Sequence, residues 1–337
     1  MQQGALMLDL RRLQHVWYGG GSVPWSWRIL AALYGAIVGV RRRLYAARLL
    51  GSARLPVPVI VVGNITAGGT GKTPLSIALV QALRARGLNP GVVSRGYGGS
   101  ARTALRVDAV TDPRIAGDEA CLMAQATSAP VVVGRDRVAA ARLLLATAEV
   151  DIVISDDGLQ HYALRRDAEI CVIDGDRRFG NGLMLPAGPL REPVGRAGEC
   201  DFRVCNGGLA QGGEIPMTLA TEDAESVFDP RLRRALASFA GERVHAVAGI
   251  GNPQRFFDQL RGLHIDVVEH AFADHFEFAA NDIQFGDALP VLMTRKDAVK
   301  CAAFADERHW SVPVRAQLPE QFYDNLADLV RRRLVET

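Results

Sequence analysis

A glycine-rich stretch that ends in Gly71-Lys72-Thr73 carries the residue types best suited to phosphate chemistry. It follows a β-branched run at 57–62 and precedes apolar residues at helical spacing over 75–83. Glycines let backbone N–H groups approach phosphate oxygens, and a helix N-terminus adds partial positive charge. The stretch therefore predicts a P-loop that binds a nucleoside triphosphate, with Lys72 on the β- and γ-phosphates and the Thr73 hydroxyl on Mg²⁺.

The predicted loop departs from the general pattern at one position, because Thr66 stands where the first glycine is usual. Gly68 and Gly69 can supply the missing backbone freedom. The predicted ATP-binding residues are Thr66, Ala67, Gly68, Gly69, Thr70, Gly71, Lys72 and Thr73.

Two adjacent carboxylates form a second candidate site. Asp156 and Asp157 follow directly after a predicted strand at 151–155, whose centre is apolar, downstream of the P-loop. Ligands of parallel sheets bind at the carboxyl ends of the strands, and an aspartate there is typical of a Walker B position. The pair is therefore predicted to hold Mg²⁺, directly or through water.

One histidine lies in a chemically distinctive stretch, Phe272-Ala273-Asp274-His275-Phe276. A lone histidine beside aromatic residues is more often structural, so composition alone does not assign His275 a role. A Gly- and Pro-rich segment over 174–193 predicts a long loop, where functional residues often concentrate.

Charge and cysteine content narrow the class of protein. The 337 residues are 48% hydrophobic and carry a net charge of +2, yet residues 1–54 contain eight Arg and one Asp. A basic, apolar N-terminus before a mildly acidic body favours a membrane surface over nucleic acid as partner. The five cysteines include no Cys-x-x-Cys pair, which argues against a zinc site and for reduced thiols in the cytosol.

Strands and helices alternate through the chain, which predicts an α/β fold with a mostly parallel sheet. Strands are expected at 91–94, 131–133, 151–155 and 168–173, with helices from about 117 and over 136–148. After a linker near 200–220, strands are expected at 244–248, 265–269, 290–293 and 312–316, with helices at 253–263 and 320–335. The predicted division is a helical segment at 1–54, a P-loop core at 55–205 and a smaller α/β domain at 206–337, linker included.

The N-terminal segment is expected to form amphipathic helices over 5–50, broken near 19–21. Only twelve uncharged residues separate Arg28 from Arg41, whereas a spanning helix needs about twenty apolar residues. A helix that lies in the membrane interface is the better prediction, with a full crossing possible only if Arg28 snorkels. The alternative is a helix packed on the body of the protein.

Several motifs in a fixed order resemble one family, the tetraacyldisaccharide 4′-kinases of lipid A synthesis, and the resemblance spans most of the chain. Thr66 in the P-loop agrees with that family's own pattern. The motifs are 63–74 (Gly-Asn-Ile-Thr-Ala-Gly-Gly-Thr-Gly-Lys-Thr-Pro), 94–97 (Ser-Arg-Gly-Tyr), 117–119 (Gly-Asp-Glu), 156–161 (Asp-Asp-Gly-Leu-Gln-His), 186–193 (Pro-Ala-Gly-Pro-Leu-Arg-Glu-Pro) and 272–275 (Phe-Ala-Asp-His).

The resemblance implies transfer of the ATP γ-phosphoryl group to the 4′-hydroxyl of an acylated glucosamine disaccharide 1-phosphate, which yields lipid IVA. It implies a P-loop NTPase-type domain, a second, smaller α/β domain joined by a short β linker, and an N-terminal membrane-associated segment (residues 1–50) at the cytoplasmic face of the bacterial inner membrane. Nucleic acid is not an expected partner.

The resemblance also implies roles for single residues. Asp118 and His275 would act as a catalytic pair, together with Lys72 and Asp157. The implied metal ligands are Thr73, Asp156, Asp157 and Glu192, and the implied acceptor-binding residues are Tyr97, Arg137, Gln160, His161 and Arg191. The family often has a second polar residue after the Asp-His pair, where this chain has Phe276, so a second histidine has no counterpart here.

Because Asp118 and His275 belong to different predicted domains, we expect the site to lie between them, and we expect closure on ATP and acceptor to complete the pair. Two other readings remain open. One is a membrane-bound switch ATPase or GTPase, although Lys296 in Thr294-Arg295-Lys296-Asp297 is displaced from the guanine-reading pattern. The other is a soluble small-molecule kinase whose N-terminal helices only pack.

Overall fold

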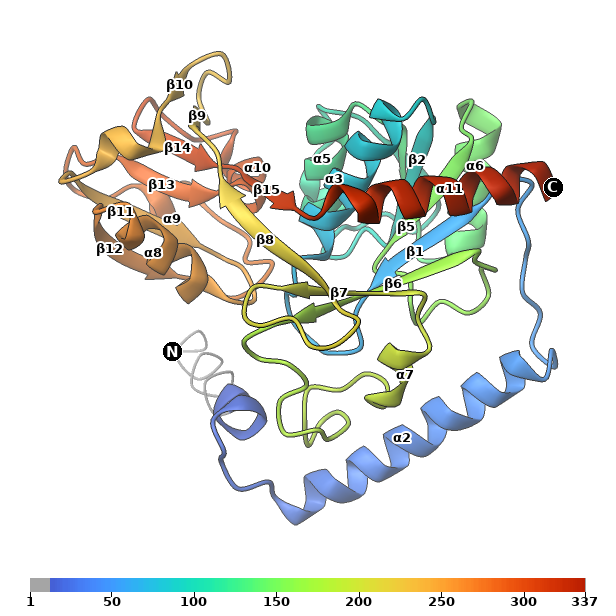
Figure 1. The fold of residues 1–337 in the computed structure, drawn as a ribbon. Coiled ribbons are helices and arrows are strands. Elements are labelled where there is room, and N and C mark those ends of the chain that lie inside the picture. Colours follow the sequence, from blue (N-terminus) through green and yellow to red (C-terminus); the bar gives the residue numbers. More distant parts are fainter. Residues whose placement is uncertain (1–12, 337) are drawn as a thin grey trace.

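The computed structural model describes residues 13–336 and contains two α/β units side by side (Figure 1). The larger unit is built on a nine-stranded sheet in the order β15-β8-β7-β6-β1-β5-β2-β4-β3. Its strands are β1 (Val59–Gly63), β2 (Pro90–Ser94), β3 (Leu105–Val107), β4 (Val131–Val133), β5 (Ile152–Asp156), β6 (Ala168–Asp174), β7 (Phe202–Asn206), β8 (Ile215–Thr221) and β15 (Val314–Gln317).

The centre of this sheet is parallel and buried on both faces. β1 pairs in parallel with β5 and β6, and only the edge strands β3 and β15 pair antiparallel with their neighbours. Near-continuous Val and Ile in β1 and β5 suit strands covered on both sides. The carboxyl ends of the parallel strands therefore meet at one edge, where the P-loop and Asp156 lie.

Helices cover the two faces. One face packs against α3 (Lys72–Ala85), α5 (Asp118–Thr127) and α11 (Glu320–Glu336), through apolar residues such as Leu79, Met123 and Leu326. The other face packs against α6 (Arg137–Thr147) and the segment that follows β6, which contains α7 (Gly195–Gly198). The short helix α4 (Pro113–Ala116) precedes α5.

The smaller unit has a six-stranded sheet in the order β10-β9-β14-β13-β11-β12. Its helices are α8 (Pro253–Gly262), α9 (Ala280–Ile283) and α10 (Arg295–Cys301), with a 3₁₀ turn at Leu236–Phe239. Its strands are β9 (Ala224–Ser226), β10 (Arg233–Arg234), β11 (Arg243–Ala248), β12 (Asp266–Ala271), β13 (Val291–Thr294) and β14 (His309–Val312). The fold class predicted from the sequence, a P-loop-type sheet with a second α/β unit, is confirmed.

The boundary between the units differs from the prediction. The segment near 200–220 contains β7 and β8, which extend the first sheet, so the first unit continues past residue 205 and only β8 leads on to the smaller unit. The expected strand at 312–316 is two strands, β14 and β15, which lie in different sheets on either side of Pro313. Proline cannot donate a backbone hydrogen bond, and the chain changes sheet at this residue.

The C-terminal helix also belongs elsewhere than expected. The predicted division places this helix in the second domain (residues 206–337), but the buried face of α11 packs into the core of the first sheet. Figure 1 shows α11 lying along that sheet. The chain thus enters the smaller unit after β8 and returns through β15, and these two antiparallel strands connect the units.

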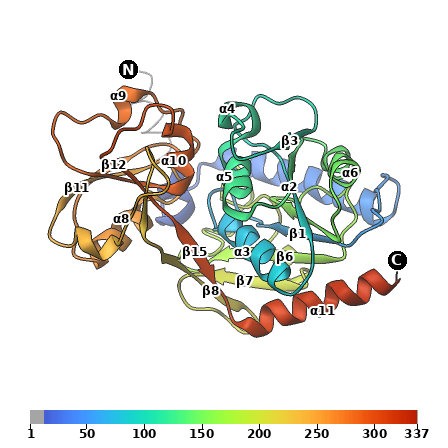
Figure 2. The same cartoon turned by 90° about the horizontal axis from the view of Figure 1, so that it is seen from above.

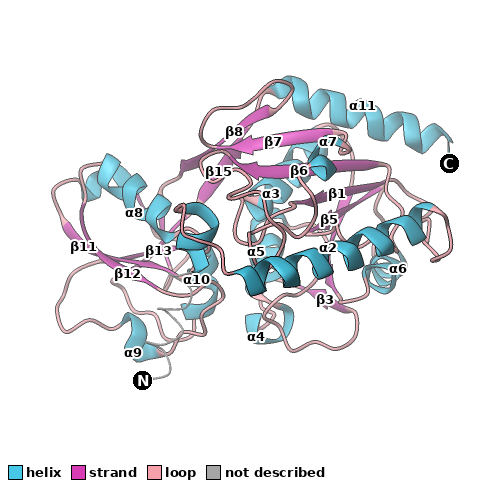
Figure 3. Cartoon of the chain, turned by 90° about the horizontal axis from the view of Figure 1, so that it is seen from below, coloured by secondary structure: helices cyan, strands magenta, loops and turns pink. Residues whose placement is uncertain are grey.

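The N-terminal part lies against the loop after β6. Residues 13–18 are helical, and a longer helix, α2 (Trp25–Ala46), follows after the break near 19–21. The Trp17 indole donates to the Pro186 carbonyl at 3.0 Å, and the Tyr34 hydroxyl donates to the Arg191 carbonyl at 3.2 Å. Figure 3 shows α2 lying across the underside of the first unit. The predicted helix over residues 5–12 lies outside the described residues.

Within the described part of the chain, none of the helices combines the length and apolar character that a membrane crossing needs. α2 nevertheless carries an exposed apolar face. Its members are Trp25, Ile29, Leu30, Leu33, Ile37 and Val40.

Candidate active site

The P-loop connects β1 to α3 at the carboxyl edge of the sheet. Gly71 adopts a φ of 92°, and a Cβ there would lie 2.4 Å from the Asn206 amide nitrogen, so only glycine fits. The Lys72 ammonium donates to Asn64 Oδ1 at 3.2 Å and lies 3.5 Å from Asp157 Oδ1. The predicted phosphate-binding lysine therefore sits at the mouth of the loop beside a predicted metal ligand.

Asp156 is the most buried carboxylate of the site. Its side chain has no exposed surface, Oδ1 accepts a hydrogen bond from the Ser76 hydroxyl at 2.7 Å, and Oδ2 has no partner among residues 13–336. Burial, together with the negative charge of Glu119, raises the pKa of Asp156 to about 7. An unpartnered buried carboxylate oxygen is costly unless a cation or donor reaches it.

Asp157 is held ionised by its neighbours. Burial alone would raise its pKa, but the charges of Lys72, Arg191 and Arg137 lower it to about 2. Its oxygens lie 3.3–3.4 Å from Arg191 Nη1. The two adjacent carboxyl groups therefore differ: Asp156 takes up a proton near neutral pH, whereas Asp157 stays ionised.

Thr73, Asp156 and Asp157 supply oxygen ligands of the kind that Mg²⁺ prefers. Glu192, also predicted as a ligand, is buried and accepts hydrogen bonds from Gln160 and the Tyr162 hydroxyl. Among the described residues no three His, Cys, Asp or Glu side chains gather closely enough to hold a metal on their own. The oxygens present at the P-loop fit a metal that is also held by phosphate and water.

Asp118 and His275 are in direct contact across the seam between the units. Asp118 opens α5 and is 4% exposed, and both of its carboxylate oxygens lie 3.1 Å from His275 Nδ1. The expectation that closure completes the pair differs from the structure, in which the pair is already joined. The exposed ring of Tyr97 lies over the imidazole, with 4.5 Å between the ring centroids.

Two lysines, Lys296 and Lys300, lie beside this pair. Lys296 Nζ lies 3.1 Å from Glu119 Oε1, 3.0 Å from Asp274 Oδ1 and 3.3 Å from His275 Nε2. Lys300 Nζ lies 3.7 Å from Asp118. Burial alone would raise the pKa of Asp118, but the His275 hydrogen bond and both lysines lower it, so the carboxylate stays ionised.

The pair also faces a pocket of about 530 Å³ between the units. Its lining includes Asp118 and His275 together with apolar side chains such as Phe276, Phe278 and Phe304. A ligand group that enters this pocket can therefore reach the Asp118 carboxylate.

The predicted acceptor-binding residues are only partly grouped. Arg191 contacts Asp157, and Arg137 is buried, where it donates to the Gly134 carbonyl and reaches the Asp157 carbonyl. Gln160 donates to the Asn64 carbonyl and to Glu192. His161 is half-buried, its Nε2 has no partner among residues 13–336, and burial lowers its pKa to about 4.

Three further residues of the site have no clear signal in the sequence. Lys296 and Lys300 lie in α10, directly after β13. Only Lys296 belongs to a recognisable sequence pattern, the superficial guanine-reading motif at 294–297. Asn206 ends β7 and donates to the Thr70 carbonyl of the P-loop at 3.0 Å. A polar residue at the end of a buried strand was the available signal for Asn206.

Comparisons with known proteins identify relatives of this chain. The family model described as Tetraacyldisaccharide-1-P 4'-kinase matches residues 23–331. A protein of Stenotrophomonas maltophilia named Tetraacyldisaccharide 4'-kinase is 55% identical over 322 residues, covering 93% of this chain and 94% of its own. A protein of the same name from Xanthomonas campestris pv. campestris is 54% identical over 329 residues, covering 93% of each chain.

A solved structure shares the fold. It is the "apo" form of LpxK from Aquifex aeolicus in complex with ATP, with a TM-score of 0.74 and 29% identity over 90% of this chain and 96% of that one. A family match over most of the sequence and relatives above 50% identity leave one assignment: the chain is a kinase that belongs to the tetraacyldisaccharide-1-P 4′-kinase family.

Proposed function

We propose that this kinase performs its reaction at the seam between the units, where Asp118 and His275 accept the proton of the attacking 4′-hydroxyl. The proposal rests on one observation: His275 of the smaller unit contacts Asp118, the first residue of α5 in the P-loop unit. A sugar hydroxyl is a poor nucleophile, and a positioned base contributes about 10²–10⁴-fold in rate. The proton belongs to the coupled pair and not to either residue alone.

ATP would bind with its phosphates on the P-loop. Lys72 would exchange its contacts with Asn64 and Asp157 for the β- and γ-phosphates. Thr73, Asp156 and Asp157 would hold Mg²⁺, which neutralises charge on the phosphate oxygens when bound. The unpartnered Oδ2 of Asp156 supports this assignment, because a bound cation would satisfy it.

The acceptor would lie on the other side of the γ-phosphate. Arg191 and Gln160 stand at the Asp157 side of the site, and Tyr97 covers His275. His161 and Arg137 border the same segment. We assign these five side chains to binding of the acylated glucosamine disaccharide 1-phosphate, the acceptor that the relatives' name implies.

The exposed apolar face of α2 would hold the enzyme on the membrane that contains its substrate. Acyl chains do not leave a bilayer readily, so an enzyme acting on them gains from docking at the surface. Arg41 and Arg43 follow the apolar face and would attract anionic lipid, at about 1 kcal/mol each. We place the enzyme at the cytoplasmic face of the bacterial inner membrane, where ATP is present.

The test is transfer of labelled γ-phosphate from ATP to detergent-dispersed tetraacyldisaccharide 1-phosphate by wild type, Asp118→Asn and His275→Asn. His275 has a φ of 59°, which asparagine tolerates, and His264→Asn at a φ of 61° is the matched control. We expect labelled lipid from wild type and the control, and at least about 100-fold less from the two site variants, which still bind ATP. Phosphate released to water without labelled lipid would favour the switch ATPase.

A further inference from the structure

Asp297, in the first turn of α10, is a buried charge that the catalytic roles proposed for this chain do not use. It has no exposed surface. Oδ2 accepts the Gly249 backbone N–H at 2.8 Å and the Thr294 hydroxyl at 2.6 Å, and Oδ1 lies 2.8 Å from the Lys300 ammonium. Burying a carboxylate is costly unless it is paired and hydrogen-bonded, so these partners compensate for the lost water.

Capping of α10 explains only part of this arrangement. Asp297 stands three residues after the N-cap Thr294, where the acidic residue of a capping box reaches back to the N-cap backbone N–H. The Thr294 hydroxyl oxygen does accept the Asp297 N–H, at 3.2 Å. The carboxylate, however, turns to Gly249, which follows β11, and to Lys300 on the next turn of α10. Asp297 therefore has contacts that a helix cap does not need.

The contact with Gly249 depends on the absence of a side chain there. A Cβ on Gly249 would lie 2.9 Å from Asp297 Oδ1 and 3.3 Å from the Phe278 ring. Gly249 is not among the glycines with a positive φ, so its backbone conformation does not call for glycine. The close approach of Asp297 accounts for glycine at this position.

Lys300 connects Asp297 to the catalytic pair. α10 of the smaller unit lies beside α5 of the first unit (Figure 2), and the Lys300 ammonium lies 3.7 Å from Asp118 Oδ2. Its contact with Asp297 is an ion pair whose angles do not suit a hydrogen bond, and Nζ makes no hydrogen bond within residues 13–336. The ammonium is therefore held by charge, close to Asp297 and one step away from Asp118.

This distance leaves the oxygens of Asp118 able to receive a proton. Oδ1 accepts the Glu119 backbone N–H at 2.8 Å, and both oxygens lie 3.1 Å from His275 Nδ1. The ammonium groups of Lys296 and Lys300 stay 4.0 Å and 3.7 Å from Asp118. Ammonium groups at these distances favour the ionised carboxylate, whereas one at about 2.8 Å would donate to the lone pair that has to accept the proton.

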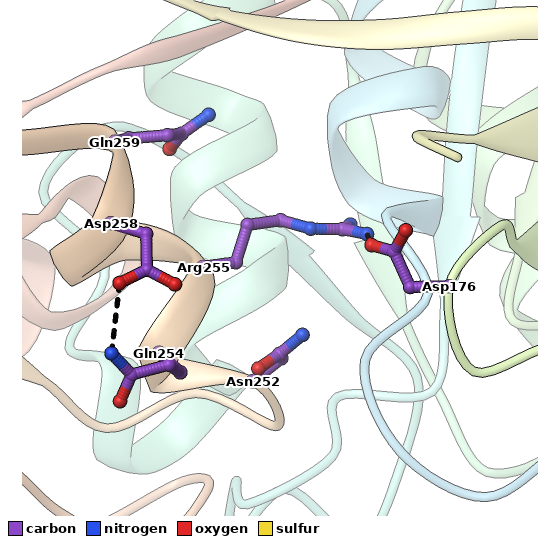
Figure 4. Close-up of a pocket in the computed structure, with 6 residues that line it drawn as sticks. All are labelled: Asp176, Asn252, Gln254, Arg255, Asp258 and Gln259. Atoms are coloured by element: carbon purple, nitrogen blue, oxygen red, sulfur yellow. Dashed lines mark hydrogen bonds and ion pairs between the residues drawn. The ribbon is translucent and has the colours of Figure 1, made fainter. Parts of the chain in front are cut away.

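The seam itself does not fix the Lys300 ammonium. Elsewhere along the seam, Arg255 of α8 donates to Asp176 of the first unit at 2.7 Å (Figure 4). Such contacts set where the smaller unit lies on the first. The Lys300 side chain is long and flexible, however, so the position of its ammonium depends on a local partner. Asp297, three residues earlier in α10, is that partner.

We propose that Asp297 is a positioning residue for the kinase reaction, which holds the Lys300 ammonium near Asp118 but out of hydrogen-bonding reach of it. The inference rests on the proposed function, because it takes Asp118 to help accept the proton of the attacking hydroxyl. Without the charge of Asp297, a movement of about an ångström lets Lys300 pair directly with Asp118. That pair would occupy an oxygen of the base and make it less basic, while the P-loop stays unchanged.

Asp297→Asn tests the proposal in the full-length protein. The amide oxygen of asparagine can still accept the Gly249 N–H and the Thr294 hydroxyl, so only the charge is lost. We expect kcat for transfer of labelled phosphate to the lipid acceptor to fall at least about tenfold, and the KM for ATP to stay within about twofold. Rates are expressed per ATP-binding site, so unfolded protein does not count as lost kcat.

The matched control is Asp306→Asn in the same unit. Asp306 also pairs with the residue three positions on, His309, at 2.8 Å. This variant should transfer phosphate as wild type does. If Asp297→Asn did so too, the positioning role would be overturned.

A second substitution separates positioning from a structural role. Adding Lys300→Met to Asp297→Asn removes the freed ammonium and leaves two neutral side chains, a replacement that buried ion pairs tolerate. We expect the double variant to recover kcat to within about threefold of wild type, because Lys296 still favours the ionised Asp118. A double variant as slow as Asp297→Asn would contradict the proposal, since removing Lys300 cannot repair a merely structural loss.

Gly249→Ala tests the same contact with every charge kept, and it decides the matter if Asp297→Asn does not fold. Its Cβ would press on Asp297 Oδ1 and displace the carboxylate that holds Lys300. We expect kcat to fall at least about fivefold with unchanged ATP affinity. The control is Gly286→Ala, where a Cβ meets nothing within 4 Å. Equal kcat in the two alanine variants would also overturn the proposal.

These outcomes differ from a failure of the proposed function. Wild-type transfer by Asp118→Asn would remove the base itself, and the role of Asp297 with it. If Asp118→Asn is inactive while Asp297→Asn transfers phosphate as wild type does, only the positioning role is wrong.

Discussion

The imidazole of His275 lies 3.1 Å from the carboxylate of Asp118, although 157 residues separate them in the chain. Asp118 belongs to the first helix turn of α5 in the P-loop unit, and His275 follows β12 in the smaller unit. The relative placement of two sheets therefore sets the geometry of a single hydrogen bond. Any change that moves the smaller unit by about an ångström should affect phosphoryl transfer more than ATP binding.

Lys296 should control the protonation of Asp118. Its ammonium contacts Glu119, Asp274 and His275, and its charge helps to keep the pKa of Asp118 low. We expect Lys296→Gln to lower kcat at least about tenfold with little change in ATP affinity, and to move the acidic limb of the kcat profile to higher pH. Steady-state kinetics from pH 5 to 9 measures both.

The control for this prediction is Lys296→Arg, which keeps the charge and should retain most of the activity and the wild-type pH profile. A structural role alone would reduce activity without moving the pH profile. An unchanged acidic limb in Lys296→Gln would therefore contradict the electrostatic role.

His161 should make the fold sensitive to mild acid. Burial lowers its pKa to about 4 in the folded state, compared with 6.5 in an unfolded chain. Between these values the unfolded state binds a proton that the folded state does not, so stability falls as the pH drops from about 6.5 to about 4. Urea unfolding at pH 7.5, 6 and 5 should show a smaller loss for His161→Gln than for wild type. Parallel losses would contradict the assignment.

Local signals sufficed for most elements of the fold. The β-branched run before the P-loop became β1, and the acidic start of the helix at Asp118 became α5. The boundary between the units could not be predicted, because it depends on which sheet each strand joins. β8 and β15 have no sequence feature that assigns them to the first sheet, and their pairing appears only when the chain returns after Pro313.

In the site, too, some residues have a local signal in the sequence and others depend on how distant elements pack. The P-loop, Asp156 and Asp157 were predictable from types and spacing within short stretches. Lys296 was not, because its partners Glu119 and His275 lie on other elements and no periodicity connects them. The family resemblance predicts Glu192 as a metal ligand. In the structure its carboxylate instead accepts hydrogen bonds from Gln160 and Tyr162. These contacts depend on how the loop after β6 folds.

The packing of α11 on the first sheet predicts a stability effect at a position far from the site. Leu326 is fully buried among residues of that sheet's core. Leu326→Ala should lower the free energy of unfolding by about 2–5 kcal/mol, because truncation leaves a cavity. The exposed Gln321→Ala on the same helix should change it by less than about 0.5 kcal/mol.

Nucleotide addition shows which unit loses the stability. ATP stabilises the unit that binds it. If α11 belongs to the P-loop unit, one unfolding transition should respond to both changes. ATP should raise its urea midpoint, and Leu326→Ala should lower it. A shift confined to a transition that ATP leaves unchanged would contradict this packing.

The exposed face of α2 should decide membrane binding. Ile29, Leu33 and Ile37 are each more than half exposed and recur one helical turn apart, so they form a stripe along one side. The opposite side faces the protein, where Ala31 is buried and Tyr34 bonds to Arg191. Replacing the three exposed residues by serine therefore removes apolar contact area without disturbing the packed side.

We expect this triple variant to partition at least about tenfold more weakly than wild type onto vesicles of anionic and zwitterionic phospholipid, measured by cosedimentation. Its apparent KM should rise for the lipid acceptor and stay unchanged for ATP, because the P-loop is untouched. Leu209→Ser, at a loop position that is 88% exposed, is the control and should partition as wild type does. If the triple variant and wild type bound vesicles equally, α2 would be only a packing element, as the soluble-kinase alternative requires.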